Sequence, residues 1–72
     1  PLKLAFMDPP YGAKLADTTL LALGNKGWLA PDALMIVEIG KDDELVVPRA
    51  FQSLDQRTYG AAQIHFLKYQ GD

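Results

Sequence analysis

The sequence predicts an α/β fold in which a parallel strand-helix-strand unit is followed by an antiparallel hairpin. Three features indicate this fold: an apolar run that stops at two prolines, a stretch with helical spacing of apolar residues, and a second apolar run with little polar interruption. Two buried strands joined by a helix of about 13 residues, all within about 40 residues, form a right-handed crossover with parallel strands. We therefore expect a three-layer α/β arrangement.

The first strand is predicted over Leu2 to Met7, which is apolar at all but one position. It ends against Asp8-Pro9-Pro10, because the two prolines remove backbone donors and prevent further sheet pairing. A helix is predicted over Ala13 to Asn25, where apolar residues recur at helical spacing. Gly24 and Gly27 are typical of a helix end.

The second strand is predicted over Ala33 to Ile39, after a connection at Trp28 to Asp32. Its apolar residues do not alternate with polar ones, which is typical of a strand covered on both faces. A solvated loop follows at Gly40 to Glu44. Two extended runs, Phe51 to Thr58 and Ala62 to Tyr69, then form a hairpin.

The last run predicts which side chains share a face. Alternation puts one set, Ala62, Ile64 and Phe66, on one side and the other set, Gln63, His65 and Leu67, on the opposite side. The intervening Tyr59-Gly60-Ala61 is the predicted turn.

Composition bounds the class of protein. The 72 residues are 49% hydrophobic and 22% charged with a net charge of −2, which is too apolar for a disordered chain and too interrupted for a membrane span. With no cysteine and one histidine, neither a disulfide nor a thiolate zinc centre can form, and this composition fits the cytoplasm. Seven lysines and arginines spread along the chain do not make the basic patch of a free-standing nucleic-acid binder.

Residues 1–72 are expected to be a single partial domain. The chain begins with Pro1 and enters an apolar strand at once, whereas an independent domain normally opens with a surface segment. We therefore expect a piece of a longer protein, whose function it shares with a missing N-terminal half.

The segment that carries chemistry is Asp8-Pro9-Pro10-Tyr11, at the carboxyl end of a predicted parallel strand, where ligands of open α/β sheets bind. The prolines hold the loop rigid, so that Asp8 and the carbonyls near Pro9 can accept hydrogen bonds from a ligand. Tyr11 adds a flat face. Acceptors beside an aromatic ring suit a planar base with an exocyclic amine, whose nitrogen becomes a better nucleophile toward a sulfonium methyl donor when its hydrogens are held.

This motif resembles the (D/N/S)-P-P-(Y/F/W) motif of S-adenosylmethionine-dependent amino-methyltransferases. Together with Gly27-Trp28-Leu29-Ala30-Pro31, the strand Leu34 to Ile39, Lys41 to Leu45, and Arg57-Thr58-Tyr59-Gly60, it is similar to the carboxyl half of bacterial small-subunit ribosomal RNA guanine-N2 methyltransferases of the RsmD type. The similarity covers essentially the whole chain.

The resemblance implies a class I (Rossmann-like) methyltransferase fold and an enzyme that uses S-adenosylmethionine on ribosomal RNA or the assembling small subunit. Its catalytic residues would be Asp8, Pro9, Pro10 and Tyr11, with Asp8 and Pro9 holding the guanine amine and also meeting the cofactor, and Tyr11 stacking on a flipped base. The glycine-rich loop that cradles the cofactor is missing from this sequence, so we expect half a cofactor site, no metal site and an isolated chain without activity.

Two other functions stay open. An adenine-N6 methyltransferase is possible because the motif can hold either amine, and a non-catalytic scaffold could use the loop as a rigid contact.

Several further residues have a structural and a functional interpretation each, and we favour the structural one: a core contact for Trp28, a partly exposed sheet position for His65, solvated positions for Lys14, Glu38 and the Asp42-Asp43-Glu44 loop, and a lock on the hairpin for Arg57 and Tyr59. We also expect the apolar first strand to favour self-association.

Overall fold

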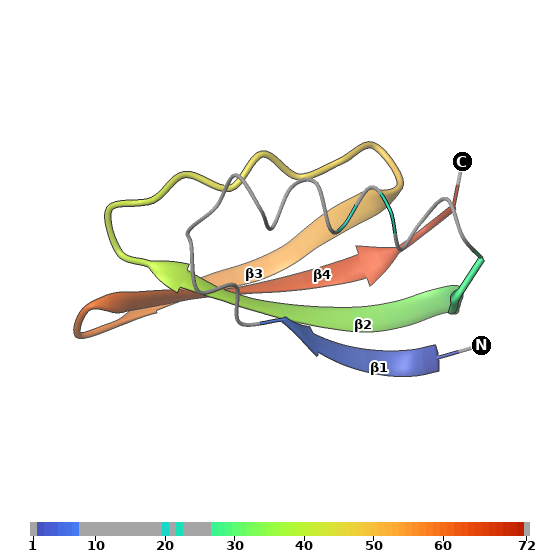
Figure 1. Cartoon of the computed structure of the whole chain (residues 1–72), viewed down its shortest axis with the longest axis horizontal. Helices are drawn as coiled ribbons and strands as arrows, with labels where there is room; N and C mark the ends of the chain where they lie inside the picture. The colour runs from blue at the N-terminus through green and yellow to red at the C-terminus, as the bar shows by residue number, and fades with distance from the viewer. Residues whose placement is uncertain (1, 8–19, 21, 23–26, 72) are drawn as a thin grey trace.

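The computed structural model describes residues 2–7, 20, 22 and 27–71. Within these residues lie the strands β1 (Leu2–Met7), β2 (Leu29–Gly40), β3 (Phe51–Tyr59) and β4 (Ala62–Tyr69). They form one mixed sheet in the order β1-β2-β4-β3 (Figure 1). β1 and β2 are parallel, whereas β2 with β4 and β3 with β4 are antiparallel, so the predicted parallel pair and terminal hairpin are confirmed.

Most of the predicted helix, Ala13 to Asn25, lies outside the described residues. Leu20 and Ala22 are the two described residues of that stretch, and both are helical. The side chain of Leu20 is completely buried in the hydrophobic core. No helix in the described part of the chain is long and apolar enough to cross a membrane.

The second strand begins earlier than predicted. β2 starts at Leu29, so the connection predicted at Trp28 to Asp32 is wrong for all but its first residue. Leu2 pairs with Leu29, and the register then jumps to Leu4 with Leu34, which leaves extra residues of β2 in a bulge. Asp32 lies in this bulge with a φ of 67°, a left-handed conformation that aspartate tolerates better than most residues.

The hairpin matches its predicted bounds to within one residue. Tyr59 pairs with Ala62, which leaves Gly60 and Ala61 as a two-residue turn. Gly60 has a φ of 56°, and a positive φ at the first turn residue is the requirement that glycine meets in a type II′ hairpin. The local chain therefore sets the register between β3 and β4.

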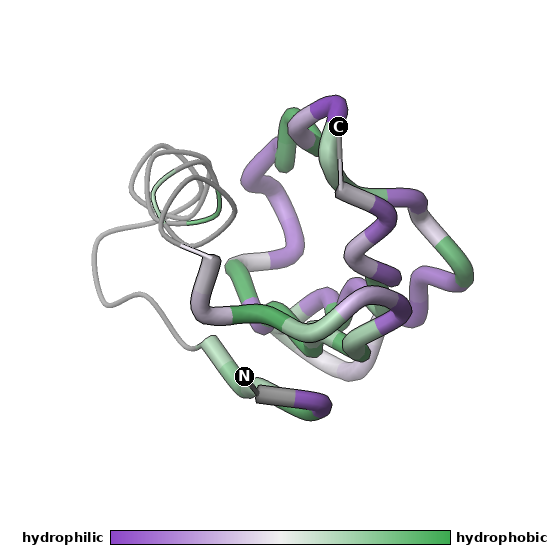
Figure 2. The backbone as a smooth tube through the Cα atoms, turned by 90° about the vertical axis from the view of Figure 1, so that its right-hand side faces the viewer, coloured by the Kyte–Doolittle hydropathy of each residue, from purple (hydrophilic) through white to green (hydrophobic). Residues whose placement is uncertain are grey.

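The hydrophobic core lies on one face of the sheet. Along β2 the side chains alternate in burial, and Met35, Val37 and Ile39 point to the buried face. The connection from β2 to β3 arches over this face (Figure 1), and its Leu45, Val47 and Pro48 are wholly or partly buried there. Because burial alternates along β2, hydrophobic and hydrophilic positions interleave in the sheet (Figure 2).

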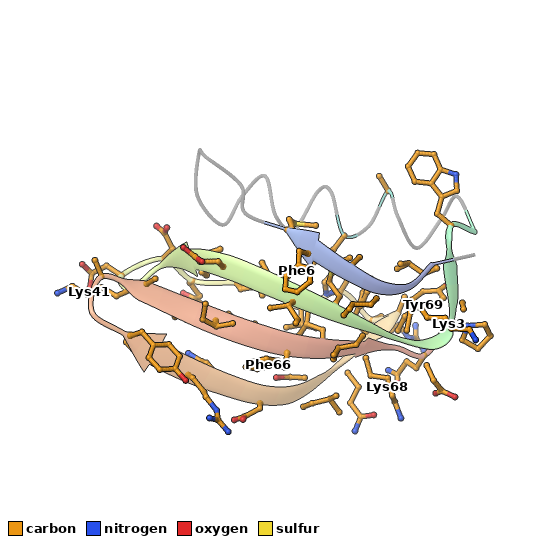
Figure 3. All side chains as sticks on the ribbon, turned by 90° about the horizontal axis from the view of Figure 1, so that it is seen from below. Lys3, Phe6, Lys41, Phe66, Lys68 and Tyr69 are labelled. Carbon is orange, nitrogen blue, oxygen red and sulfur yellow. The ribbon has the colours of Figure 1, made fainter. Side chains whose placement is uncertain are left out.

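The opposite face is open where Figure 3 looks onto it. Phe6 is 74% exposed and Leu4 is 51% exposed. Phe6 pairs with Ile36, which pairs in turn with Phe66, and these two side chains are half-buried. The apolar run of the second strand predicted cover on both faces, but the described residues cover only one. The described part of the chain supplies one covering layer, so cover on the other face stays a prediction.

Candidate functional site at the carboxyl edge of the parallel strands

The carboxyl ends of β1 and β2 lie at the same edge of the sheet. Met7, the last residue of β1, pairs with Val37, and β2 continues for three more residues to Gly40. The predicted site residues Asp8, Pro9, Pro10 and Tyr11 follow Met7 in the sequence and lie outside the described residues, as does Lys14. The structure therefore describes the strand ends and the loop after β2, and the site at Asp8 to Tyr11 stays a prediction.

The loop after β2 is a closed turn from Gly40 to Asp43. The amide of Asp43 donates to the Gly40 carbonyl at 3.0 Å, and the amide of Gly40 donates to Asp43 Oδ2 at 3.1 Å. Lys41 donates its amide to the Ala61 carbonyl at 2.9 Å, which ties the loop to the hairpin turn. A Cβ on Gly40 would lie 2.8 Å from Asp43 Oδ2, so only glycine fits this turn without a shift.

Gln63 holds this loop from β4. Its side chain is 5% exposed, and its Nε2 donates to the carbonyls of Gly40 at 2.9 Å and Lys41 at 3.2 Å and to that of Asp43. The amide has two hydrogens for three carbonyls, so one hydrogen is shared. Three backbone acceptors that face solvent in most loops are thus satisfied by one buried side chain.

The other end of the Gln63 amide accepts hydrogen bonds. Gln56 Nε2 donates to Gln63 Oε1 at 2.9 Å, and His65 Nε2 lies 2.8 Å from the same oxygen. A carbonyl oxygen can only accept, so His65 must carry a proton on Nε2. The same contacts fix the amide orientation, because a flipped Gln63 would turn its oxygen toward three carbonyls.

His65 is buried and not partly exposed as predicted, since its side chain is 6% exposed. Burial lowers the pKa of His65 below its ordinary value of 6.5. The alternation of β4 was predicted correctly, but the set with two polar residues turned out to face the core. The hydrogen bond between Gln63 and His65 offsets part of the free-energy cost of burying two polar side chains.

Asp55, Arg57 and Tyr59 interact along β3. Arg57 Nε donates to Asp55 Oδ2 at 3.0 Å, and hydrogen bonds from the Arg57 guanidinium to Tyr59 and to Asp55 raise the pKa of Arg57. The hydrogen bond from Arg57 lowers the pKa of Asp55 in turn. All three residues belong to β3, so these contacts do not join the two strands of the hairpin, and the lock on the hairpin stays a prediction for Arg57 and Tyr59. An exposed ion pair of this kind contributes little to stability.

Trp28 does not seal the connection against the core as predicted, because it is 55% exposed. Its neighbour Leu29 is buried and fills that position. Glu38 is exposed on β2, and Asp42 and Glu44 are exposed in the loop, as expected. No group of three metal-ligating side chains occurs among the described residues.

Sequence reasoning placed Gln63 on a face of the last strand but gave it no role. The loop carbonyls that Gln63 binds are 20 to 23 residues away in the chain. Only the β2–β4 register, in which Ile39 pairs with Gln63, brings the side chain beside the loop. A polar residue that alternates with Leu67 was a weak signal of a buried polar contact.

Comparison with known proteins identifies the family. A model of the family described as conserved hypothetical protein 95 matches residues 1–68. The chain is 37% identical over 57 residues to the ribosomal RNA small subunit methyltransferase D of Haemophilus influenzae, and 36% identical over 70 residues to that of Escherichia coli K12. These matches cover 79% and 97% of the chain but only 30% and 35% of the relatives, so the chain spans about a third of their length.

Two solved structures share the fold. One, assigned as a methylase from Haemophilus influenzae, superposes on 94% of this chain and 42% of its own with a TM-score of 0.83 and 31% identity. The other, assigned as a methyltransferase from Escherichia coli, covers 97% of this chain and 40% of its own with a TM-score of 0.84 and 25% identity. The mixed sheet is thus of the kind found in methylase structures.

The chain belongs to the conserved hypothetical protein 95 family. Its curated relatives are named ribosomal RNA small subunit methyltransferase D, which confirms the resemblance to the RsmD type drawn from the motifs.

Proposed function

We propose that this chain is the base-holding part of an S-adenosylmethionine-dependent methyltransferase that acts on the exocyclic N2 amine of a guanine in small-subunit ribosomal RNA. The observation that carries the proposal is the location of Asp8-Pro9-Pro10-Tyr11 directly after β1, whose carboxyl end shares an edge with that of β2. Family membership and the names of the relatives support it.

The proposed chemistry uses the motif as a holder. Asp8 and the carbonyl of Pro9 accept hydrogen bonds from the amine, Pro10 keeps the loop rigid, and Tyr11 stacks on the base. Hydrogen bonds to both amine hydrogens favour a pyramidal nitrogen, whose lone pair becomes available for attack on the methyl carbon of a sulfonium donor. The carbon–sulfur bond would break at the same time, and its electron pair would leave with the sulfur as a neutral thioether. The surplus proton on the nitrogen then passes to Asp8 or to water.

S-adenosylmethionine would supply an electrophilic methyl group on a sulfonium. Asp8 and Pro9 would meet it on one side, and the turn from Gly40 to Asp43 borders the same edge of the sheet. The sequence has no glycine-rich loop after a strand, so this chain fits only one side of the cofactor. The remainder of the cofactor site would come from the N-terminal half of a longer, cytoplasmic protein, and the isolated chain would be inactive.

The test is Asp8→Ala in the full-length protein. We expect methyl transfer to ribosomal RNA to be lost while S-adenosylmethionine binding, measured by calorimetry, stays within about twofold, because the N-terminal half would supply most contacts to the cofactor. Asp55→Ala, which removes an exposed carboxylate from β3 at the edge of the sheet opposite β1, is the matched control and should keep full activity. Unchanged turnover in Asp8→Ala would remove the catalytic assignment.

The product identifies the substrate. Nucleosides from methylated RNA, separated and weighed by mass spectrometry, should contain N2-methylguanosine. Methylation at adenine N6 would favour the other enzymatic function, and a wild-type protein that binds no methyl donor and modifies neither base would favour a scaffold.

A further inference from the structure

We propose that Gln63 is a positioning residue that fixes the backbone of the Gly40–Asp43 turn at the edge where the base and the methyl donor meet. This inference rests on the proposed function for its effect on catalysis, but its structural basis is independent of it. Gly40 is the last residue of β2 and pairs with Ala62, and Lys41 donates its amide to the Ala61 carbonyl. The amide of Asp43 bonds only to Gly40 within the turn, so the position of this part of the turn relative to the sheet depends on side chains.

The hydrogen bonds make Gln63 the main side-chain link between this turn and the sheet, beside the backbone pairing of Gly40 and Lys41. Its Nε2 contacts three of the four carbonyl positions from Gly40 to Asp43, whereas the Asp43 carboxylate closes the turn only onto itself. Gln63 in turn is held by Gln56 and His65 at its oxygen. The turn is therefore connected through one side chain to both strands of the hairpin.

The location gives this connection a catalytic consequence. Gly40 ends β2 at the edge of the sheet where the carboxyl end of β1 also lies, and Asp8 is the next residue after the end of β1. Reacting groups must be aligned to within a fraction of an ångström for efficient transfer, and a 1 Å displacement can cost about a hundredfold. When these hydrogen bonds are present, the turn stays in a fixed position beside the site. When they are lost, the turn can move into the site.

The chain offers a matched control at the other end of β4. Gln70 Nε2 donates to the carbonyl of Arg49 at 3.2 Å, so it also joins a strand end to the backbone of a loop. Gln70 is exposed and lies at the edge of the sheet away from the carboxyl ends of β1 and β2. A substitution there removes the same kind of bond without affecting the proposed site.

The experiment compares Gln63→Met with Gln70→Met in the full-length protein, because methionine has a similar length and cannot form these bonds. In folded protein, checked by circular dichroism, we expect kcat/KM for ribosomal RNA to fall on the order of tenfold in Gln63→Met, mainly through kcat, and to stay within about twofold in Gln70→Met. Equal losses in both variants, or no loss in Gln63→Met, would overturn the proposal.

Hydrogen exchange separates this inference from the proposed function. In Gln63→Met the amides of Gly40, Lys41 and Asp43 should exchange at least tenfold faster than in the wild type, whether or not the protein methylates RNA. If Gln63→Met fails to fold, the same amides are measured in Gln56→Met, which removes one donor to Gln63 from an exposed position and should also accelerate exchange. Unchanged exchange in the variant measured would overturn the positioning role, whereas wild-type protein without methyl transfer would overturn only the proposed function.

Discussion

The ring Nε2 of His65 lies 2.8 Å from Oε1 of Gln63, and both side chains are buried on the core face of β4. The neutral imidazole serves as a donor here, and it faces Val37 across the strand pair and Gln56 on the other side. A second proton on this ring would place a charge among apolar and neutral groups. Protonation of His65 would therefore be unfavourable in the folded state, and the stability of this buried network should depend on pH.

Stability should fall as the pH drops below neutrality. Burial lowers the pKa of His65 in the folded state, so below about 6.5 the unfolded chain binds a proton that the folded chain does not. The free energy of unfolding should therefore decrease as pH falls through 6.5 toward the lowered pKa, by at most about 1.4 kcal/mol per pH unit for one group. Urea unfolding of the full-length protein between pH 5.5 and 7.5, conditions chosen to span about one unit on each side of that value, measures it.

His65→Gln is the control for this pH effect. Glutamine can keep a donor near Gln63 Oε1 but does not titrate, so the difference in stability between wild type and variant should vary across this range. The exposed Asp55, whose pKa is also lowered, titrates below 3.8 and cannot produce the same effect. Parallel curves for wild type and His65→Gln would contradict the assignment.

The sequence predicted the strands well because their signals are local. Two prolines end β1, Gly60 forms the hairpin turn, and alternation along β4 sorted its side chains correctly. The start of β2 was misplaced because the bulge at Asp32 depends on pairing with β1, which Ala30 and Pro31 do not indicate. The role of Gln63 was missed for a similar reason, since the loop carbonyls that it binds are distant in the chain.

Gly40 and Asp43 should be energetically coupled. In Gly40→Ala the new Cβ would lie 2.8 Å from Asp43 Oδ2 and would force the carboxylate off the Gly40 amide, at a cost of about 1 kcal/mol. Asp43→Ala loses the same bond without a clash. The double variant should therefore cost less than the sum of the two single variants in urea unfolding, whereas strict additivity would show that the contact has no energetic weight.

Tyr11 is expected to act through its ring. Tyr11→Phe keeps a face for stacking and should retain most of the methyl transfer by the full-length protein. Tyr11→Ala should lower kcat/KM for RNA by about 5- to 150-fold, which corresponds to the roughly 1–3 kcal/mol of one base–aromatic stack. An equal loss in both variants would assign the effect to the hydroxyl and contradict the stacking role.

The open face of the sheet should make the 72-residue chain associate with itself. β1 is at the edge of the sheet, and its Phe6 and Leu4 are 74% and 51% exposed. Apolar side chains on an edge strand favour pairing with another copy, and a lysine there opposes it. Light scattering should therefore detect oligomers that grow with concentration, fewer of them for Phe6→Lys. Val46→Lys replaces an exposed apolar residue outside the sheet and should not change the association. A single monomeric species at high concentration would show that the exposed face and edge of β1 do not drive association.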